Sequence, residues 1–487
     1  MSRFAQFSGW IPAIVVLILV TTTPPFASPD GIEAVAAGAC VLTPGADCVG
    51  LELWFWPPAL GLIGGALSHL GLSVSVAATL LSLGFGALAM VPLGKLAARI
   101  GGPLALWLAP MLVLCVPDLR LHLMMGDARP IALFGLLWAW ELTLSRGRVG
   151  WIAAACALAV LARTESLAPV GLLFCFGLIK EYRSLRNPRT WLVFLLLMAP
   201  YWLALSWVSG HPSLSSQGWQ SQVYPWLDQL PMTWLELDLA AGARDTPFRL
   251  LLSSGKGAGV PGASPPLGLD LWVLRKGMRH AVAWWCLPLC VFSLRQGQAR
   301  WAALLLALPA LAITALMPQA QDFVLPAKNL LPMGWAVALL AGGGLARLST
   351  RIRLPALGLG AVTLALAASL PQQVMIGGDA RLSNGLLSDL PQGSVAAALS
   401  TAPEVLRSGR TRRRLPSPWA AKAWLEGPER SDYLVFSSQD LPFVQRSLAV
   451  IQENAELEVH TIRRGPVDLV VLVAIEPRGP KHDSGAP

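Results

Sequence analysis

Residues 73–94 read SVSVAATLLSLGFGALAMVPLG, a run of 22 residues without one charged side chain. A helix that crosses a hydrocarbon core about 30 Å thick needs about 20 such residues. Similar apolar runs recur along the 487-residue chain, separated by short breaks that are basic or rich in Pro and Gly. This pattern predicts a polytopic α-helical membrane protein.

The composition leads to the same fold class. Hydrophobic residues make up 54% of the chain and charged residues 13%, whereas soluble domains carry about 25% charged residues. A disordered chain, a collagen-like fibre and a disulfide-framework secreted domain are excluded. The net charge of +9 is spread over the predicted loops and the C-terminal tail instead of one basic face, so it does not indicate a nucleic-acid partner.

About eleven membrane spans are expected, at residues 9–27, 73–94, 103–118, 129–145, 150–163, 167–180, 190–209, 280–295, 301–317, 329–346 and 354–371. The apolar stretch 57–72 is short and begins with two prolines. We expect it to form an interfacial or re-entrant helix and not a crossing.

The distribution of charge predicts the orientation. The first loop after a span, 28–56, contains no Lys or Arg but holds Asp30, Glu33, Asp47 and Glu52. Basic turns follow at alternate breaks, the first of them at 94–99 (GKLAAR). By the positive-inside rule the N-terminus is cytoplasmic and the C-terminus lies on the outer, periplasmic or extracytoplasmic side of a cell (inner) membrane.

Two domains are predicted. Residues 1–371 form the transmembrane domain, with outside loops at 28–56 and 209–279. Residues 372–487 lose the long apolar runs, and short β-rich runs at 394–399, 432–436, 457–462 and 468–475 alternate with helical patterns at 419–425 and 441–454. This alternation predicts a small α/β domain on the outer face.

Seven cysteines are present, and the predicted topology places only Cys40 and Cys48 outside the membrane. We expect a disulfide between them, because the outer compartment is oxidising and no other outside cysteine is available. The other cysteines lie in predicted spans and fit core packing.

Three acidic or charged features at span boundaries are candidates for chemistry. Asp30 follows the first span and can act as a general base on a hydroxyl substrate, or it can cap the helix that contains Glu33. Glu33 itself is a secondary candidate.

Asp127 lies at a later boundary on the same predicted face. Together with Asp30 it could hold a divalent metal or orient a polar substrate, and its alternative role is a cap for the following helix. His122, with no second histidine near it in the sequence, fits packing better than metal ligation but stays a secondary candidate.

Arg163, Thr164 and Glu165 interrupt two apolar runs. Charges at membrane depth are costly and usually face a cavity or a partner. Arg163 could contact a phosphate anion, or the two charged residues could form an ion pair that stabilises the turn.

The order of these elements resembles a known family. Asp30, the segment 56–60 (WPPAL), the basic segment 94–99, Asp127 and the Arg163–Glu165 segment follow one another as in membrane glycosyltransferases of the GT-C fold, in the branch of protein mannosyltransferases and aminoarabinose transferases. The resemblance covers about the first 210 residues.

The resemblance implies an inverting transfer of a sugar, on the outer face, from a polyprenyl-phosphate donor to a lipid, glycan or protein acceptor. It implies Asp30 as the catalytic base and Asp127, Arg163 and Glu165 as residues that bind substrate or phosphate. Many members carry an Arg-Tyr pair where this chain has Asp322 and Phe323. Lys328 is the candidate for the missing cation, and a divalent metal at Asp30 and Asp127 stays open.

Three other functions compete with this interpretation. A transporter or flippase of lipid-linked material would place charges deep in several spans, whereas here they cluster at boundaries. A polymerase or ligase of surface polysaccharide would also use a large outer loop. A non-catalytic scaffold that displays the C-terminal domain is the third.

The charge pattern yields a first test of the topology. Reporter domains fused after Arg148 and after Gly377 should report opposite sides of the membrane, because basic turns alternate with acidic or neutral ones. A phosphatase reporter active only outside and a fluorescent reporter active only inside would measure this. The same side for both fusions would contradict the predicted orientation.

Overall fold

The structure is a computed structural model that describes residues 10, 13–14, 29–44, 57–180, 182–209, 286–296, 301, 304–311, 325–352, 358, 360, 362, 394–397, 412–414, 421–427, 430–437, 441–463 and 469–477. Contacts divide the chain into two compact units. The first comprises residues 1–25, 54–60 and 78–374, and the second 26–53, 61–77 and 375–487. The predicted boundary at residue 371 and the outer loop 209–279 stay predictions, and that loop lies almost wholly outside the described residues.

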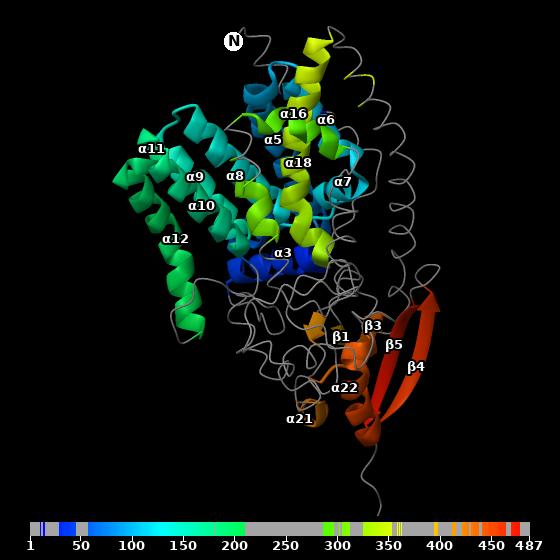
Figure 1. Ribbon diagram of the computed structural model, residues 1–487. Coiled ribbons are helices and arrows are strands. Elements are labelled where there is room, and N and C mark those ends of the chain that lie inside the picture. Colours follow the sequence, from blue (N-terminus) through cyan, green and yellow to red (C-terminus); the bar gives the residue numbers. More distant parts are fainter. Residues whose placement is uncertain are drawn as a thin grey trace, which may run out of the picture. The chain divides into compact units, whose positions relative to one another are not determined.

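The first unit is helical (Figure 1). Its main elements are α5 (Val74–Gly101), α6 (Ala105–Cys115), α7 (Pro117–Met124), α8 (Arg129–Leu144), α9 (Val149–Ala162), the 3-10 turn η1 (Thr164–Ser166), α10 (Leu167–Ile179), α11 (Arg183–Arg186), α12 (Pro188–Ser209), α16 (Leu287–Leu294) and α18 (Leu325–Arg351). A further helical segment covers residues 304–311.

Three of the helices in the described part of the chain, α5, α12 and α18, are long and apolar enough to cross a membrane. Helices α6, α9 and α10 have 11, 14 and 13 residues, and at about 1.5 Å per residue each is shorter than the hydrocarbon core. These helices are consistent with a membrane protein. The count of about eleven spans stays a prediction, since most of 9–27 and 354–371 lies outside the described residues.

The prediction of a basic turn at 94–99 is wrong. Helix α5 continues through these residues to Gly101, because Lys and Arg are good helix formers and no helix breaker interrupts them. The chain turns instead at Gly102, whose φ is 91°, a left-handed conformation that glycine adopts without steric cost. Arg99 therefore lies on the helix, where its guanidinium is 3.6 Å from the carboxylate of Glu141 in α8.

The segment after α6 also differs from the expected loop. Residues 117–124 form helix α7, which begins with Pro117 in its first turn, a position that suits proline because the first backbone N–H groups of a helix have no partner within it. The predicted loop is thus reduced to the tight connection between α7 and α8.

Three consecutive glycines in α18 bring four helices together. A Cβ atom at Gly342 would meet the backbone of Ala109 in α6, and one at Gly343 would meet the Ile100 side chain in α5. A Cβ atom at Gly344 would overlap the carbonyl group of Leu289 in α16. Small residues allow such close approach of helix backbones, so this triple glycine fixes the packing of α5, α6 and α16 on α18.

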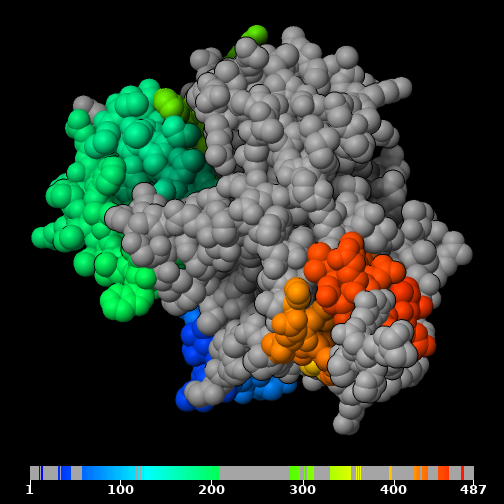
Figure 2. Space-filling view, turned by 90° about the horizontal axis from the view of Figure 1, so that it is seen from below, coloured from blue at the N-terminus to red at the C-terminus, as the bar shows by residue number. Residues whose placement is uncertain are grey.

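Helix α12 leaves a broad apolar face uncovered. Its exposed large side chains are Leu192, Leu195, Leu196, Leu197, Leu203 and Trp207. Figure 2 shows α12 in green at the molecular surface. In a membrane protein such a face contacts lipid tails, since exposed apolar patches of this size are rare on soluble proteins.

In the second unit, α3 (Pro29–Leu42) packs against α4 (Pro58–His69). The contact is made by small residues, because a Cβ atom at Gly61 would meet the carbonyl of Ala34 and one at Gly65 would meet the backbone of Gly38. With 12 residues, α4 is about 18 Å long, too short to cross the hydrocarbon core.

Cys40, near the end of α3, is disulfide-bonded. The other five cysteines that the structure describes, Cys115, Cys156, Cys175, Cys286 and Cys290, are free thiols. Cys48 lies outside the described residues. The pairing of Cys40 with Cys48 stays a prediction.

The C-terminal part of the second unit contains a five-stranded sheet of order β2-β1-β3-β5-β4. Its strands are β1 (Val395–Ala397), β2 (Arg412–Arg414), β3 (Tyr433–Ser437), β4 (Ala455–Arg463) and β5 (Leu469–Pro477), accompanied by α21 (Ala421–Glu426) and α22 (Leu441–Asn454). Strand β1 pairs in parallel with β2 and β3, and β5 pairs antiparallel with β3 and β4. The position of this C-terminal α/β part on the outer face of the membrane stays a prediction.

One polar contact joins the starts of β1 and β3. The backbone N–H and the hydroxyl of Ser394 donate to Oδ2 of Asp432 at 2.8 and 3.0 Å, and the Asp432 N–H donates to the Ser394 hydroxyl at 3.2 Å. The hydrogen bond from the Ser394 backbone lowers the pKa of Asp432 below its ordinary value. The contact is therefore strongest at neutral pH and weakens as the carboxylate is protonated in acid.

The triple glycine gives a test of the helix packing. Gly344→Ala should destabilise the protein by about 1–3 kcal/mol, because the added methyl group overlaps the Leu289 carbonyl. The matched control is Gly171→Ala in α10, where, among the described residues, no atom beyond the adjacent turns of the helix lies within 4 Å of the new Cβ. That change should be neutral or stabilise by up to about 1 kcal/mol. Thermal unfolding in detergent measures both, and equal melting temperatures would contradict the proposed close contact.

Candidate functional site

A turn between α7 and α8 fixes one ion pair. Gly126 has a φ of 66°, a left-handed conformation that prevents α7 from continuing. Asp127 is the next residue. The Asp127 side chain is buried, and its Oδ1 accepts a hydrogen bond of 3.2 Å from the backbone N–H of Arg129. Its Oδ2 accepts a second bond from the Arg129 guanidinium. Asp127 therefore holds both the first residue of α8 and the direction of its side chain.

His122 of α7 faces the same carboxylate. Its Nδ1 is 4.0 Å from Oδ2 of Asp127, and both side chains are almost fully buried. The Ser82 hydroxyl of α5 donates to the His122 backbone carbonyl at 3.3 Å. The His122 ring thus lies next to the Asp127–Arg129 pair, and its packing role stays a prediction.

A second ion pair follows α9. Arg163 has extended backbone angles, φ −148° and ψ 116°, so that the helix stops and η1 begins. The Arg163 guanidinium donates to Oε1 of Glu165 at 2.5 Å, and the two side chains are 12% and 17% exposed. The ion pair, one of the two roles that the sequence left open for Arg163, is present, and the phosphate contact stays a prediction.

The two pairs meet at one pocket. The guanidinium of Arg129 lies within electrostatic reach of Glu165, and Arg129, Arg163 and Glu165 all line a pocket that holds about 590 Å³ of empty space including its open mouth. Among the described residues these are the charged side chains on its wall. The rest of the wall is mostly apolar and comes from α8, α10, α18 and the 304–311 helix. The pocket thus has a charged end and an apolar body.

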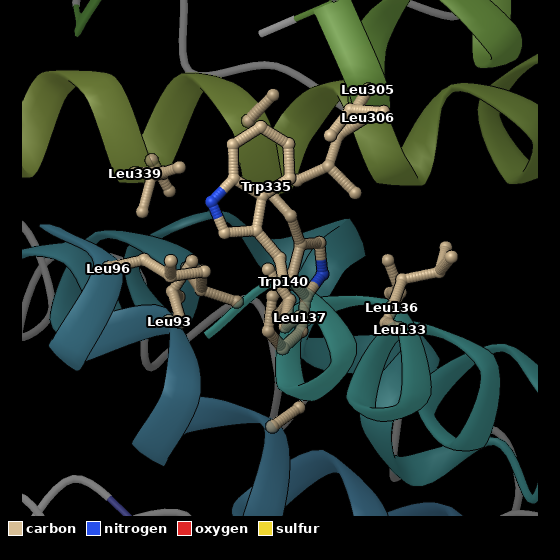
Figure 3. Close-up of a cluster of buried hydrophobic side chains, with 14 of the residues drawn as sticks. Leu93, Leu96, Leu133, Leu136, Leu137, Trp140, Leu305, Leu306, Trp335 and Leu339 are labelled. Atoms are coloured by element: carbon tan, nitrogen blue, oxygen red, sulfur yellow. The ribbon is translucent and has the colours of Figure 1, made fainter. Parts of the chain in front are cut away.

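The apolar body continues into a second hollow. Leu136, Pro169, Leu305 and Leu306 line both cavities, and the second adds Leu96, Leu137, Trp140, Leu173 and Leu339. Figure 3 shows the side chains of α5, α8, α18 and the 304–311 helix directed toward one another here, with Trp140 and Trp335 at the centre. We call the two cavities together the tail groove. Its lining is apolar along most of its length and charged at one end.

The structure brings some predicted site residues together and leaves others apart. Arg163 and Glu165 lie on the pocket wall, whereas Asp127 stands behind Arg129 and does not line it. Arg129 is the residue that the sequence interpretation missed. The DxR spacing of Asp127 and Arg129 at the start of an apolar helix is the signal that could have found it.

The remaining candidates are placed only through their backbone. Asp30 and Glu33 lie in α3, in the second unit, and their side chains are outside the described set. Lys328 lies in α18, about one turn before the pocket residues Leu331 and Pro332. Asp322 and Phe323 are outside the described residues.

The geometry of Asp127 does not fit a metal site. Both of its oxygens accept hydrogen bonds from Arg129, whose guanidinium supplies the positive charge that a cation would supply there. Among the described residues no group of three or more His, Cys, Asp or Glu side chains could hold a metal ion. Asp127 is therefore a partner of Arg129 and not a metal ligand.

Comparison with solved structures identifies the fold. ArnT from Cupriavidus metallidurans bound to undecaprenyl phosphate superposes with a TM-score of 0.56 at 14% identity, over 97% of this chain and 98% of ArnT. The Archaeoglobus fulgidus oligosaccharyltransferase in its apo form gives a TM-score of 0.56 at 12% identity, over 92% of this chain and 71% of that one. The chain has the GT-C fold.

The GT-C fold was the resemblance expected from the sequence, and it is confirmed. The archaeal oligosaccharyltransferase AglB from Archaeoglobus fulgidus, in complex with an inhibitory peptide and a dolichol-phosphate, gives a TM-score of 0.51 at 11% identity. The match covers 92% of this chain and 71% of AglB. These neighbours are glycosyltransferases and membrane enzymes. No protein-family profile matches the sequence, and no curated protein matches it.

The buried Asp127–Arg129 pair gives a stability test. Asp127→Asn keeps an acceptor for the Arg129 N–H but removes the charge that offsets its guanidinium, which should cost about 3 kcal/mol or more of stability. The double variant Asp127→Asn/Arg129→Met removes the uncompensated charge and should recover most of this loss. Thermal unfolding of the three proteins measures it. A helix cap alone would cost Asp127→Asn about 1 kcal/mol or less, with no recovery in the double variant.

Proposed function

We propose that this chain is an inverting glycosyltransferase that moves a sugar from a polyprenyl-phosphate donor to a hydroxyl-bearing acceptor at the outer face of the membrane. The observation that carries the proposal is the tail groove, because Arg129 and Arg163 stand at the end of a cavity whose body is apolar. A phosphate joined to an isoprenoid tail has the same division between a charged and an apolar part.

The fold supports this ligand class. A neighbour with the same fold, ArnT, is bound to undecaprenyl phosphate, and AglB is in complex with a dolichol-phosphate. Both are polyprenyl phosphates, so the lipid chemistry that the groove suggests agrees with that of two neighbours. The sugar and the acceptor are not specified by these observations.

The apolar wall would bind the tail by van der Waals packing, because the tail comes from a bilayer that is as apolar as the groove. Leucines from α8, α18 and the 304–311 helix provide the surface. The phosphate would then lie near Arg129 and Arg163, where charge-assisted hydrogen bonds from guanidinium groups are strong.

The transfer needs one base and two cations. The acceptor oxygen attacks C1 of the sugar and forms a new C1–O bond, while the bond between C1 and the phosphate oxygen breaks and its electron pair leaves with the phosphate. The acceptor proton passes to the carboxylate of Asp30, the base that we propose. The donor phosphodiester carries one negative charge and the released polyprenyl phosphate two, so the arginines would stabilise charge that develops in the transition state.

Asp127 takes a supporting role in this proposal. Its two hydrogen bonds to Arg129 fix the guanidinium before the ligand arrives, which lowers the ordering cost at binding. Lys328, about one turn from the pocket residues of α18, is the candidate for a third cation.

Kinetic measurements should distinguish the role of the base from the role of the cations. Asp30→Asn removes the base and should lower kcat by at least about two orders of magnitude. Arg163→Gln removes a phosphate contact, so the donor KM should rise as well. Sugar transfer from polyprenyl-phosphate donors in proteoliposomes measures both parameters.

The matched control for the base is Glu33→Gln, which changes a carboxylate one turn along α3. We expect it to retain kcat within about ten-fold, since a single base suffices. An Asp30→Asn enzyme that works at the parent rate would remove Asp30 as the base. Loss of activity in Glu33→Gln alone would transfer that role to Glu33.

A further inference from the structure

The four charges at the pocket form an alternating row. Asp127 pairs with Arg129, Arg129 lies within electrostatic reach of Glu165, and Glu165 pairs with Arg163. With two arginines and two carboxylates the formal charge of the row is zero. His122, the titratable neighbour behind Asp127, leaves this sum unchanged while it is neutral.

A neutral row is unexpected for a site that only has to attract phosphate. Asp127 stands behind Arg129, but Glu165 lies on the pocket wall itself, where its negative charge faces any bound phosphate. A carboxylate in that position weakens phosphate binding, and the weakening grows with the charge on the phosphate.

We propose that Glu165 makes the pocket discriminate between the singly charged phosphodiester of the donor and the doubly charged phosphomonoester of the product, so that the spent lipid carrier is released. This inference rests on the proposed function and adds a role for Glu165 as a specificity-determining residue. The two lipids share the same tail, and their phosphate charge is the difference that Glu165 senses.

The proposal has a quantitative consequence. The Coulomb energy between Glu165 and a phosphate is proportional to the charge on the phosphate, so removal of the carboxylate changes the binding free energy of a dianion about twice as much as that of a monoanion. The fold-change in Kd for the dianion is then about the square of that for the monoanion. If Glu165→Gln tightens a phosphodiester about 5-fold, it should tighten a phosphomonoester about 25-fold.

Two lipids of known charge test this without knowledge of the sugar. Undecaprenyl phosphate represents the product and undecaprenyl methyl phosphate represents the donor charge. Their Kd values are measured for the full-length parent protein and for Glu165→Gln in detergent micelles at pH 8, where the monoester is a dianion because its second pKa is about 6. At pH 5 the monoester is a monoanion, so both lipids should respond to Glu165→Gln by the same factor.

Two control variants keep the result interpretable. Glu141→Gln also removes a buried carboxylate that is paired with an arginine, but Glu141 does not line the pocket. It should leave the ratio of the two Kd values as in the parent. Glu165→Asp keeps the charge and should restore discrimination to within about two-fold of the parent, even if Glu165→Gln lowers the melting temperature.

The outcomes separate the two proposals. A larger effect of Glu165→Gln on the monophosphate than on the methyl ester at pH 8, lost at pH 5, supports the role of Glu165. Equal fold-changes at pH 8, or loss of discrimination in Glu165→Asp as well, overturn it while the proposed function stands. If the parent protein binds neither lipid, the proposed function itself fails.

Discussion

The close approach of helices at Gly342, Gly343 and Gly344 is the contact on which the rest of the helical unit depends. Three neighbouring helices reach the backbone of α18 at these residues, which fixes both the axial position and the rotation of α18 in the bundle. The positions of the preceding turns of the same helix are then fixed as well. They place Trp335 and Leu339 in the apolar cluster that Figure 3 shows, and Leu331 on the wall of the pocket. The tail groove is thus a consequence of packing that lies up to three turns away from it.

The charged end obeys a different constraint. A buried charge is stable only when a partner offsets its desolvation, and here each partner lies two positions away in the sequence. Asp127 reaches Arg129, and Arg163 reaches Glu165, because each pair lies where a helix is interrupted or about to begin. Gly126 and the extended backbone of Arg163 provide these interruptions. Local pairing keeps the four charges in place before any ligand binds.

Much of the helical fold could be predicted because apolar runs reveal helices directly. The expected span 129–145 is α8 and 150–163 is α9, each within one residue at either end. The end of α5 was misplaced because Lys95 and Arg99 look like a loop, although only a residue such as Gly102 stops the helix. In the second unit the predicted run 432–436 is one residue from β3 and the run 457–462 lies within β4, whereas β2 consists of three arginines and carries no hydrophobic alternation. Arg129 was missed for a related reason, since a charge at the first residue of an apolar helix is usually a solvated boundary. Its burial depends on Asp127 and on the neighbouring helices, which the sequence order does not reveal.

The division of the groove into an apolar body and a charged end determines where selectivity can arise. A polyprenyl-phosphate donor and the carrier that it leaves behind have identical tails, so the leucines and Trp140 would bind both equally. Such uniform binding anchors the lipid but cannot drive the exchange of product for donor. Apart from contacts with the sugar itself, every difference in affinity must therefore come from the few side chains near the phosphate. A pocket of arginines alone would favour the more highly charged product. In the proposed reaction, the neutral row of Asp127, Arg129, Glu165 and Arg163 would remove much of that preference while it keeps guanidinium groups beside the charge that develops during transfer. The same four residues would thus reconcile stabilisation of the transition state with release of the product.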